Sequence, residues 1–146
     1  MTKSYEDIEV DDRWSTEARE VTREEMVGFA RRYDPQEMHV DEDEARETFF
    51  GGLVASGWFT ASVSMRLVVD EFLNEYAVVG AMGVDDLRWH EPVRPGDVLR
   101  VRGEVVGKET WDENHGLVRY EQETVREEDD DIVMSLSADV LFERRG

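Results

Sequence analysis

The sequence predicts an α+β domain in which an antiparallel sheet wraps around one long helix. Residues 48–65 carry no charge, and residues 57–73 fit a helix that is apolar or small on most sides, as buried helices are. From residue 77 onward, strand-like segments alternate with short turns. Four or five strands with one such helix require the sheet to wrap around it. The 146 residues suit one domain over residues 1–146.

The N-terminal third is expected to hold a short strand and a capped helix. Residues 15–21 read as a polar strand, possible at a sheet edge. Thr22 and Glu25 have the spacing of a capping box, so a helix is expected to follow and to run to about Tyr33. Pro35 disfavours helical geometry at the residue before it and therefore ends this helix.

A second, short helix and a glycine-containing segment lead into the long helix. Residues 41–48 are polar and fit a short helix, with Asp41 near its start. Residues 49–56 form the approach to the long helix. Ser56 can cap that helix, which begins at Gly57.

The C-terminal half is expected to supply the sheet. Residues 77–84 form one strand, and residues 87–90 form another strand or its continuation. Prolines and a Gly-Asp pair predict a turn over residues 92–97, and residues 127–131 form an acidic hairpin turn. The remaining strands are expected at residues 98–108, 117–126 and 132–142.

The charge balance excludes some functions. The chain has 36 acidic and 17 basic residues, for a net charge of −19, and only two of the basic residues are lysines. Strong negative charge opposes nucleic-acid binding, and this composition resembles that of haloarchaeal cytosolic proteins. The alternative is a merely acidic protein or an acidic interaction surface. The chain has no Cys, which excludes disulfides and thiolate metal sites.

No targeting segment or membrane span is expected. The first fourteen residues are polar and acidic, without an apolar stretch. The uncharged run at residues 48–65 contains glycines, serines and threonines, and charged residues soon follow it. The sequence therefore predicts a soluble, cytoplasmic protein.

Asp34 and His39 are the candidate chemical groups. They lie five residues apart in an expected loop, ahead of a helix that begins at Gly57. A carboxylate and an imidazole can act as acid and base, and a helix N-terminus can hold an oxyanion. These are the parts needed to add or remove water next to a carbonyl. Taken alone, each residue also has a structural interpretation, as a turn Asp, a half-buried His or a helix-packing Gly.

These residues resemble those of the MaoC-like dehydratases, which have the hot-dog fold, and of the related (R)-specific enoyl-CoA hydratases. The family signature is Asp-x-Asn-Pro-x-His, and Asp34 and His39 keep its spacing. Ser56-Gly57-Trp58 falls where the family has a small residue, Gly and a hydrophobic residue, with Gly57 eighteen residues after His39. Residues 88–97 resemble the family segment F-x-x-P-V-x-x-G-D, and the resemblance covers nearly the whole chain.

The resemblance implies an enzyme and a mechanism. Asp34 and His39 would hold one water and add it in the syn sense across a trans-2-enoyl thioester, while the Gly57 N–H binds the thioester oxygen. Gln36, Ser56 and Trp58 are the expected substrate-binding residues. The substrate is an acyl-CoA or an acyl carrier protein thioester. No metal or other cofactor is implied, and a homodimer or dimer of dimers is expected.

The chain departs from the signature between the two catalytic positions. Gln36 and Glu37 replace the Asn and Pro, and a Pro directly follows Asp34. Two other functions stay open: an acyl-CoA thioesterase, disfavoured because residues 57–69 contain no Asp or Glu, and a non-catalytic acyl-binding module. His90 and His115 are read as structural. Carrier phosphates would need arginines, and the candidates are Arg88, Arg94, Arg100, Arg144 and Arg145.

Overall fold

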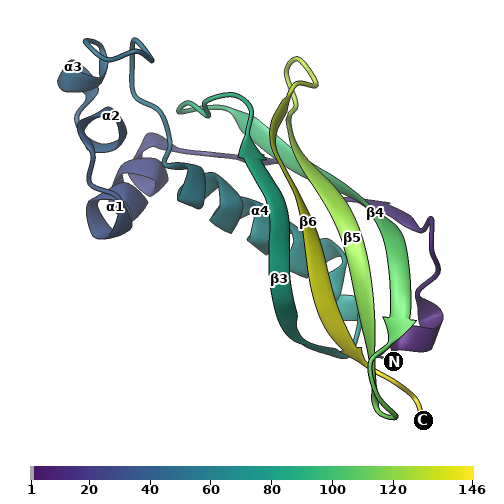
Figure 1. The fold of residues 1–146 in the computed structure, drawn as a ribbon. Coiled ribbons are helices and arrows are strands. Elements are labelled where there is room, and N and C mark those ends of the chain that lie inside the picture. The colour runs from purple at the N-terminus through teal and green to yellow at the C-terminus, as the bar shows by residue number, and fades with distance from the viewer. Residues whose placement is uncertain (1) are drawn as a thin grey trace.

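One antiparallel sheet forms the front of the molecule in the computed structural model, which describes residues 2–146 (Figure 1). Its strands are ordered β1-β4-β5-β6-β3, and β2 also pairs with β4. Long registers join β4 to β5, β5 to β6 and β6 to β3. The strands are β1 (Arg13–Ser15), β2 (Arg19–Glu20), β3 (Val78–Trp89), β4 (Val98–Thr110), β5 (His115–Arg126) and β6 (Ile132–Glu143).

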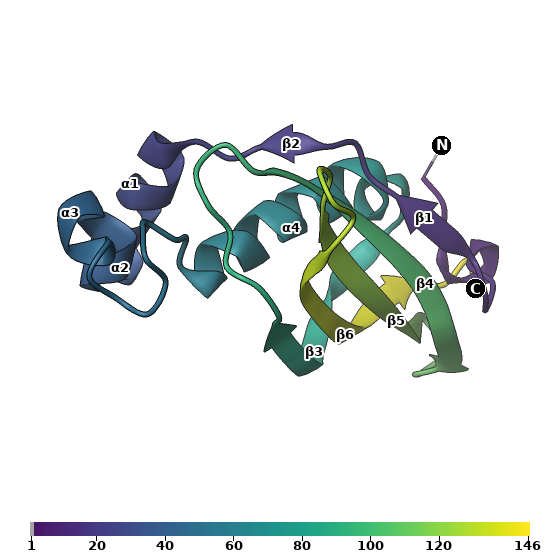
Figure 2. The same cartoon turned by 90° about the horizontal axis from the view of Figure 1, so that it is seen from above.

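The long helix α4 (Gly57–Glu71) lies against one face of this sheet, and the sheet curves around it (Figures 1 and 2). Three shorter helices extend beyond the N-terminus of α4, at the end opposite the two chain termini. They are α1 (Arg23–Tyr33), α2 (Glu37–Val40) and α3 (Glu42–Ala45). Single turns, η1 (Tyr5–Asp7) and η2 (Leu73–Glu75), complete the helical content of the described residues. The expected sheet wrapped around a central helix is confirmed.

The helix ends agree with the sequence because they are set by local contacts. The Thr22 side chain accepts a hydrogen bond from the Glu25 N–H, and Glu25 reaches back to Thr22 as a capping box requires. The Ser56 side chain accepts from the Trp58 N–H at the start of α4. Asp41 caps α3, which is shorter than the expected helix over residues 41–48.

Three expected segments differ from the structure. The strand expected at residues 15–21 is two short strands, because Thr16 bonds Val101 through both its backbone N–H and its side chain and the ladder breaks after it. The strands expected at residues 77–84 and 87–90 are one bulged strand, β3. The expected loop between Asp34 and His39 contains α2, whose single turn begins with Glu37 and Met38, both good helix formers.

The long helix is buried on one face only within this single chain. Phe59, Val63 and Leu67 pack into the core, as the apolar pattern predicts. Trp58 and Met65 on another face stay 57% and 47% exposed. The face that carries Phe59, Val63 and Leu67 therefore lies in the core, whereas the face that carries Trp58 and Met65 lines a cavity.

None of the helices in residues 2–146 has both the length and the apolar character of a membrane span. Of the fifteen arginines, eleven form ion pairs with carboxylates of the chain, which leaves a large surplus of acidic groups on the surface. At net charge −19, mutual repulsion of these groups opposes the folded state.

We predict that KCl stabilises the folded protein. Raising the ionic strength from about 0.1 M to about 1 M shortens the Debye length from roughly 10 Å to roughly 3 Å, which screens this repulsion. The thermal unfolding midpoint should rise steadily with KCl, by about 3 °C for each kcal/mol that screening adds to the free energy of unfolding. Calorimetry measures the midpoint, with sucrose as the uncharged control. A midpoint that stays flat in KCl would contradict the halophilic interpretation.

Candidate active site

Asp34 is placed at the C-terminal end of α1. Its N–H still bonds the Ala30 carbonyl, but its backbone has left the helical region, with φ −154° and ψ 66°. Pro35 explains this, because the proline ring disfavours helical geometry in the preceding residue. The side chain is mostly buried, with 18% of it exposed. The sequence thus forces the carboxylate out of the helix and towards the residues that follow.

Three side chains surround the Asp34 carboxylate. Gln36 Nε2 donates to Oδ1 at 2.7 Å and Ser56 Oγ donates to Oδ2 at 2.7 Å. His39 Nε2 lies 3.4 Å from Oδ2. Burial raises the pKa of the Asp34 carboxyl, but the hydrogen bonds from Gln36 and Ser56, together with the nearby His39 ring, lower it by more, so the pKa lies below its usual value. Asp34 is therefore a carboxylate at neutral pH.

His39 is held in one orientation by the backbone. It lies on α2 with a relative exposure of 6%, and its Nδ1 is 2.8 Å from the carbonyl oxygen of Val54. A carbonyl can only accept, so Nδ1 carries the hydrogen. In the neutral ring, Nε2 then has a free lone pair, and it is this atom that faces Asp34.

A short extended segment, residues 53–56, joins the pair to the rest of the fold. On one side, the Val54 N–H donates to the Met38 carbonyl while the Val54 carbonyl accepts from His39. On the other side, the Ala55 N–H donates to the Val93 carbonyl at 2.8 Å. Ser56 ends the segment by bonding Asp34 and capping α4. The acid/base pair and the helix N-terminus are thus tied together through four consecutive residues.

Gly57 is the first residue of α4, where the N–H has no partner within the helix. Within residues 2–146 this N–H donates to no protein group. Trp89, at the end of β3, donates from Nε1 to the Gly57 carbonyl at 2.8 Å, and a Cβ on Gly57 would clash with its ring. The close approach of this indole therefore requires glycine here.

The other expected substrate-binding residues have distinct surroundings. Gln36 and Ser56 both donate to Asp34, and Ser56 is fully buried. The Trp58 side chain is more than half exposed and packs edge-on against Trp89, with ring centroids 5.0 Å apart. Gln36 and Ser56 therefore orient the carboxylate, while Trp58 presents an open aromatic surface beside Gly57.

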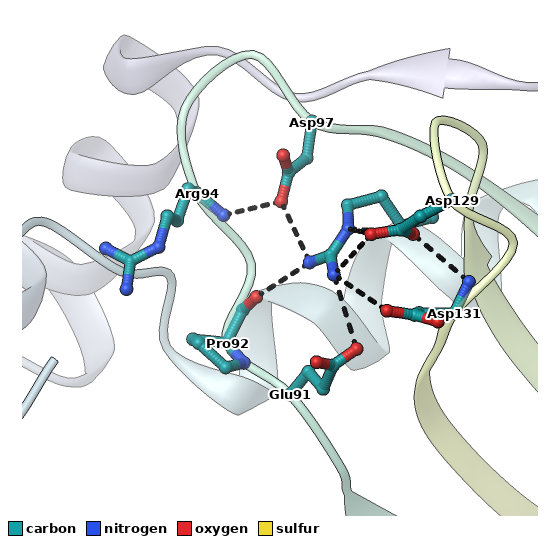
Figure 3. A network of polar contacts seen from close by, with 7 residues as sticks. Glu91, Pro92, Arg94, Asp97, Asp129 and Asp131 are labelled. Carbon is teal, nitrogen blue, oxygen red and sulfur yellow. Dashed lines mark hydrogen bonds and ion pairs between the residues drawn. The ribbon is translucent and has the colours of Figure 1, made fainter.

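The turn that holds Ala55 depends on a buried arginine. Arg126, with 15% of its side chain exposed, lies among four carboxylates: Glu91, Asp97, Asp129 and Asp131. These acids converge from the β3–β4 connection and from the β5–β6 hairpin (Figure 3). The guanidinium therefore bridges two loops that are far apart in the sequence, and it neutralises part of their charge.

The same turn also contacts the approach to α4. Arg126 donates to the Pro92 carbonyl, and Asp97 accepts from the Arg94 N–H at 2.9 Å (Figure 3). The Arg94 side chain points away from this cluster and donates to the Phe50 carbonyl at 2.8 Å. Through Phe50 and Ala55, the turn fixes both ends of the strand-like segment that carries Val54.

The five arginines considered for carrier phosphates fall into two groups. Arg100, Arg144 and Arg145 are in ion pairs with carboxylates of the chain. Arg88 and Arg94 have no carboxylate within ion-pair distance among residues 2–146. His90 bonds Ser135 and His115 bonds Asp112, in line with structural roles. No cluster of three or more metal-binding side chains exists in the described part of the chain.

The structure brings the predicted residues Asp34, His39 and Gly57 to one place, but the sequence did not indicate three of the residues that support them. Val54, Trp89 and Arg126 act through contacts between segments that are 15 to 35 residues apart. Trp89 is an isolated Trp in a charged segment, so nothing nearby in the sequence links it to Gly57. The others act through a backbone carbonyl and through a clustering of loops, which no local pattern reveals.

Comparison with known proteins gives a consistent result. Residues 8–126 match the family described as MaoC like domain. The uncharacterized protein YdeM of Bacillus subtilis is 31% identical over 96 residues, which cover 66% of this chain and 68% of YdeM. Protein MaoC of Klebsiella aerogenes is 36% identical over 101 residues, which are 68% of this chain but only 30% of that protein. The crystal structure of the MaoC-like dehydratase from Rhodospirillum rubrum superposes with a TM-score of 0.87 at 34% identity, covering 98% of both chains.

We predict that Ser56→Ala raises the pKa of the Asp34 carboxyl, because one of the hydrogen bonds that lowers it is lost. A depressed carboxyl pKa contributes stability above the unfolded value of about 3.9, and this contribution disappears as the pH falls through the folded value. As the pH falls, the Ser56→Ala protein should therefore lose this stabilisation at a higher pH than the native protein does. It should also be about 1 kcal/mol less stable, because α4 loses its N-cap side chain.

Carbon-13 NMR titration of the Asp34 carboxyl measures this change. Ser62→Ala is the matched control, because Ser62 is an exposed serine of α4 that bonds only the Trp58 carbonyl. An Asp34 pKa that is the same in Ser56→Ala and in the native protein would show that Ser56 does not tune the carboxyl.

Proposed function

Because the chain belongs to the MaoC-like dehydratase family, we propose that it catalyses the reversible syn hydration of a trans-2-enoyl-CoA to an (R)-3-hydroxyacyl-CoA. One observation carries the proposal: the Asp34 carboxylate and the Nε2 of His39 face each other at 3.4 Å, directly beside the N-terminus of α4. An acid/base pair next to an oxyanion site matches the chemistry of water and a conjugated carbonyl.

The pair is suited to hold a water molecule. Asp34 is an acceptor because it is ionised, and His39 Nε2 is an acceptor because Nδ1 carries the ring hydrogen. A water can donate one hydrogen to each, which leaves its oxygen lone pairs free to attack. Both acceptors are mostly buried and individually fixed, so the water is oriented before the substrate arrives.

The Gly57 N–H is the third group in the proposed mechanism, after Asp34 and His39. It lies at the positive end of the fifteen-residue helix α4, where developing negative charge is stabilised. In hydration, the water oxygen bonds the β-carbon, the double-bond electrons move to the thioester oxygen, and Gly57 stabilises that enolate. The pair accepts the water proton and returns a proton to the α-carbon. Because both groups act from one side, the addition is syn.

The alternative thioesterase has weaker support. Such an enzyme would need a carboxylate on the buried part of α4 to direct water at the thioester. Asp70, the first carboxylate of α4, is near the C-terminal end, is exposed and pairs with Arg66 at 2.9 Å. A non-catalytic acyl-binding module would not require the hydrogen-bonded, charged Asp34.

The acyl carrier in our proposal is CoA, and an acyl carrier protein thioester presents the same reacting atoms.

We further propose a homodimer that forms through the edge of the sheet, and two such dimers could associate further. Within residues 2–146, β3 is the last strand of the sheet and pairs with β6 alone. It is twelve residues long, and Val79, Met82 and Val84 are each about half exposed, at 50%, 54% and 51%. A long apolar edge strand favours pairing with another strand, and a second copy of β3 would extend the sheet.

For the catalytic proposal, purified protein in high KCl is mixed with crotonyl-CoA and the enoyl absorbance is followed. We expect hydration in the native protein, and a loss of about 10²–10⁴-fold in kcat in Asp34→Asn and in His39→Ala. Arg13→Met is the control, since Arg13 is an exposed residue of β1 away from the site. Release of free thiol in place of hydration would support the thioesterase, and binding without turnover would support the binding module.

For the dimer, sedimentation equilibrium gives the mass of the native protein and of two variants. Met82→Asp places a charge on the β3 edge and should yield a monomer, because burying an unpaired carboxylate opposes pairing. Val106→Asp places the same charge on β4, at a residue that is 38% exposed, and should remain a dimer. If Met82→Asp and the native protein have equal mass, β3 is not the interface.

A further inference from the structure

A cavity of about 810 Å³ lies between α4 and the sheet, and Trp58 is the lining residue that connects it to the proposed active site. Trp58, Ala61, Met65 and Val69 line it along the helix, so it follows about 16 Å of the helix axis. Trp58 directly follows Gly57, so the cavity begins where the thioester would be bound. Its walls are mostly apolar, and no charged side chain is among the residues that line it.

Asn74 and Tyr76 supply polar groups to the part of the cavity wall that follows α4, and two further polar side chains come from β5. Tyr120 and Gln122 of β5 are 3% and 6% exposed, and both line the cavity. Neither side chain makes a hydrogen bond to another group in residues 2–146. Thr124, two residues further on the same face, is different, because its hydroxyl bonds Ser64 of α4 at 2.6 Å. The polar atoms of Tyr120 and Gln122 are not fully enclosed by protein, so a ligand group or water in the cavity can bond them.

A third unpaired polar group lies beside them. The ring of Trp14 covers Gly103, which is the cross-strand neighbour of Gln122, and packs edge-on against Tyr120. Its Nε1 is buried and has no acceptor among the described residues. Three neighbouring side chains therefore retain unused hydrogen-bonding capacity, and two of them, Tyr120 and Gln122, line the cavity.

We propose that this cavity binds the acyl chain of the substrate and selects chains that carry a neutral oxygen group, a hydroxyl or a ketone, far from the thioester. This inference rests on the proposed function and specifies its substrate class. The Gln122 amide can both donate and accept. Burial raises the pKa of Tyr120 to about 12, so its hydroxyl stays protonated and can also donate.

The same lining excludes a charged chain end. A carboxylate at this depth would lose its hydration, and the cavity offers neither Arg nor Lys to compensate. A plain alkyl chain would fill the apolar part but would displace water from Tyr120 and Gln122 without replacing its hydrogen bonds. A neutral oxygen group satisfies both requirements, since it costs little to bury once it is hydrogen-bonded.

The test compares kcat/KM for trans-2-decenoyl-CoA and trans-2-dodecenoyl-CoA, each with and without a terminal hydroxyl. At one of the two lengths the native protein should prefer the hydroxylated chain by about tenfold. Gln122→Leu should abolish or reverse this preference, and Tyr120→Phe, which removes only the hydroxyl, should reduce it. The preference is a ratio within each protein, so a general loss of activity cancels. Glu121→Gln, on the outer face of the same strand, should keep the native ratio.

Binding to the Asp34→Asn protein separates this inference from the proposed function. Calorimetry with dodecanoyl-CoA and ω-hydroxydodecanoyl-CoA requires no chemistry, and the hydroxylated chain should bind about tenfold more tightly. If no enoyl-CoA is hydrated, the proposed function fails while this ratio still tests the cavity. Equal affinity for the two chains, or a preference that persists in Gln122→Leu, overturns the inference. So does a crystal structure in which side chains of a second copy fill the cavity.

Discussion

The arrangement of Asp34 and His39 depends on the hydrogen bonds made by residues 53–56. This segment is not part of the sheet. Its backbone bonds α2 on one side and the β3–β4 connection on the other. Its Val54 carbonyl fixes the tautomer of His39, and its Ser56 hydroxyl orients Asp34. Because the same segment leads into α4, any displacement of it would move Asp34, His39 and Gly57 together. These three residues therefore keep their relative positions even though α1 and α4 make few direct contacts.

The arginine cluster explains how so acidic a chain keeps that segment in place. Arg126 is surrounded by four carboxylates, and without its charge these acids would repel one another and separate the two loops that carry them (Figure 3). The cluster fixes the β3–β4 connection, and Arg94 and Val93 of that connection hold the approach to α4. One guanidinium thus extends the rigidity of the sheet to loops near the active site. Elsewhere the surplus of acids remains in solvent, where it is tolerated.

Local features of this protein could be predicted from its sequence, and contacts between distant segments could not. The capping box at Thr22, the stop at Pro35 and the cap at Ser56 each involve residues within three positions of one another. The spacing of Asp34, His39 and Gly57 was informative because the family keeps it. The break between β1 and β2 is different, since it depends on Thr16 bonding Val101, 85 residues away. The half-exposed face of α4 likewise has the same apolar composition as the buried face, so periodicity cannot distinguish a core from the wall of a cavity.

The order of these parts along the chain has an evolutionary consequence. All three proposed reacting groups lie between residues 34 and 57, whereas Tyr120 and Gln122, two polar residues of the cavity wall, belong to a strand more than sixty residues later. Substitutions of cavity-lining residues in β5 and β6, with Arg126 kept, would therefore change the proposed recognition without altering the residues proposed to react. A lineage carrying this domain could diversify its substrates by drift at these positions. For protein engineers, the same separation makes these positions suitable targets for libraries in which the reaction is kept and the accepted chain is varied.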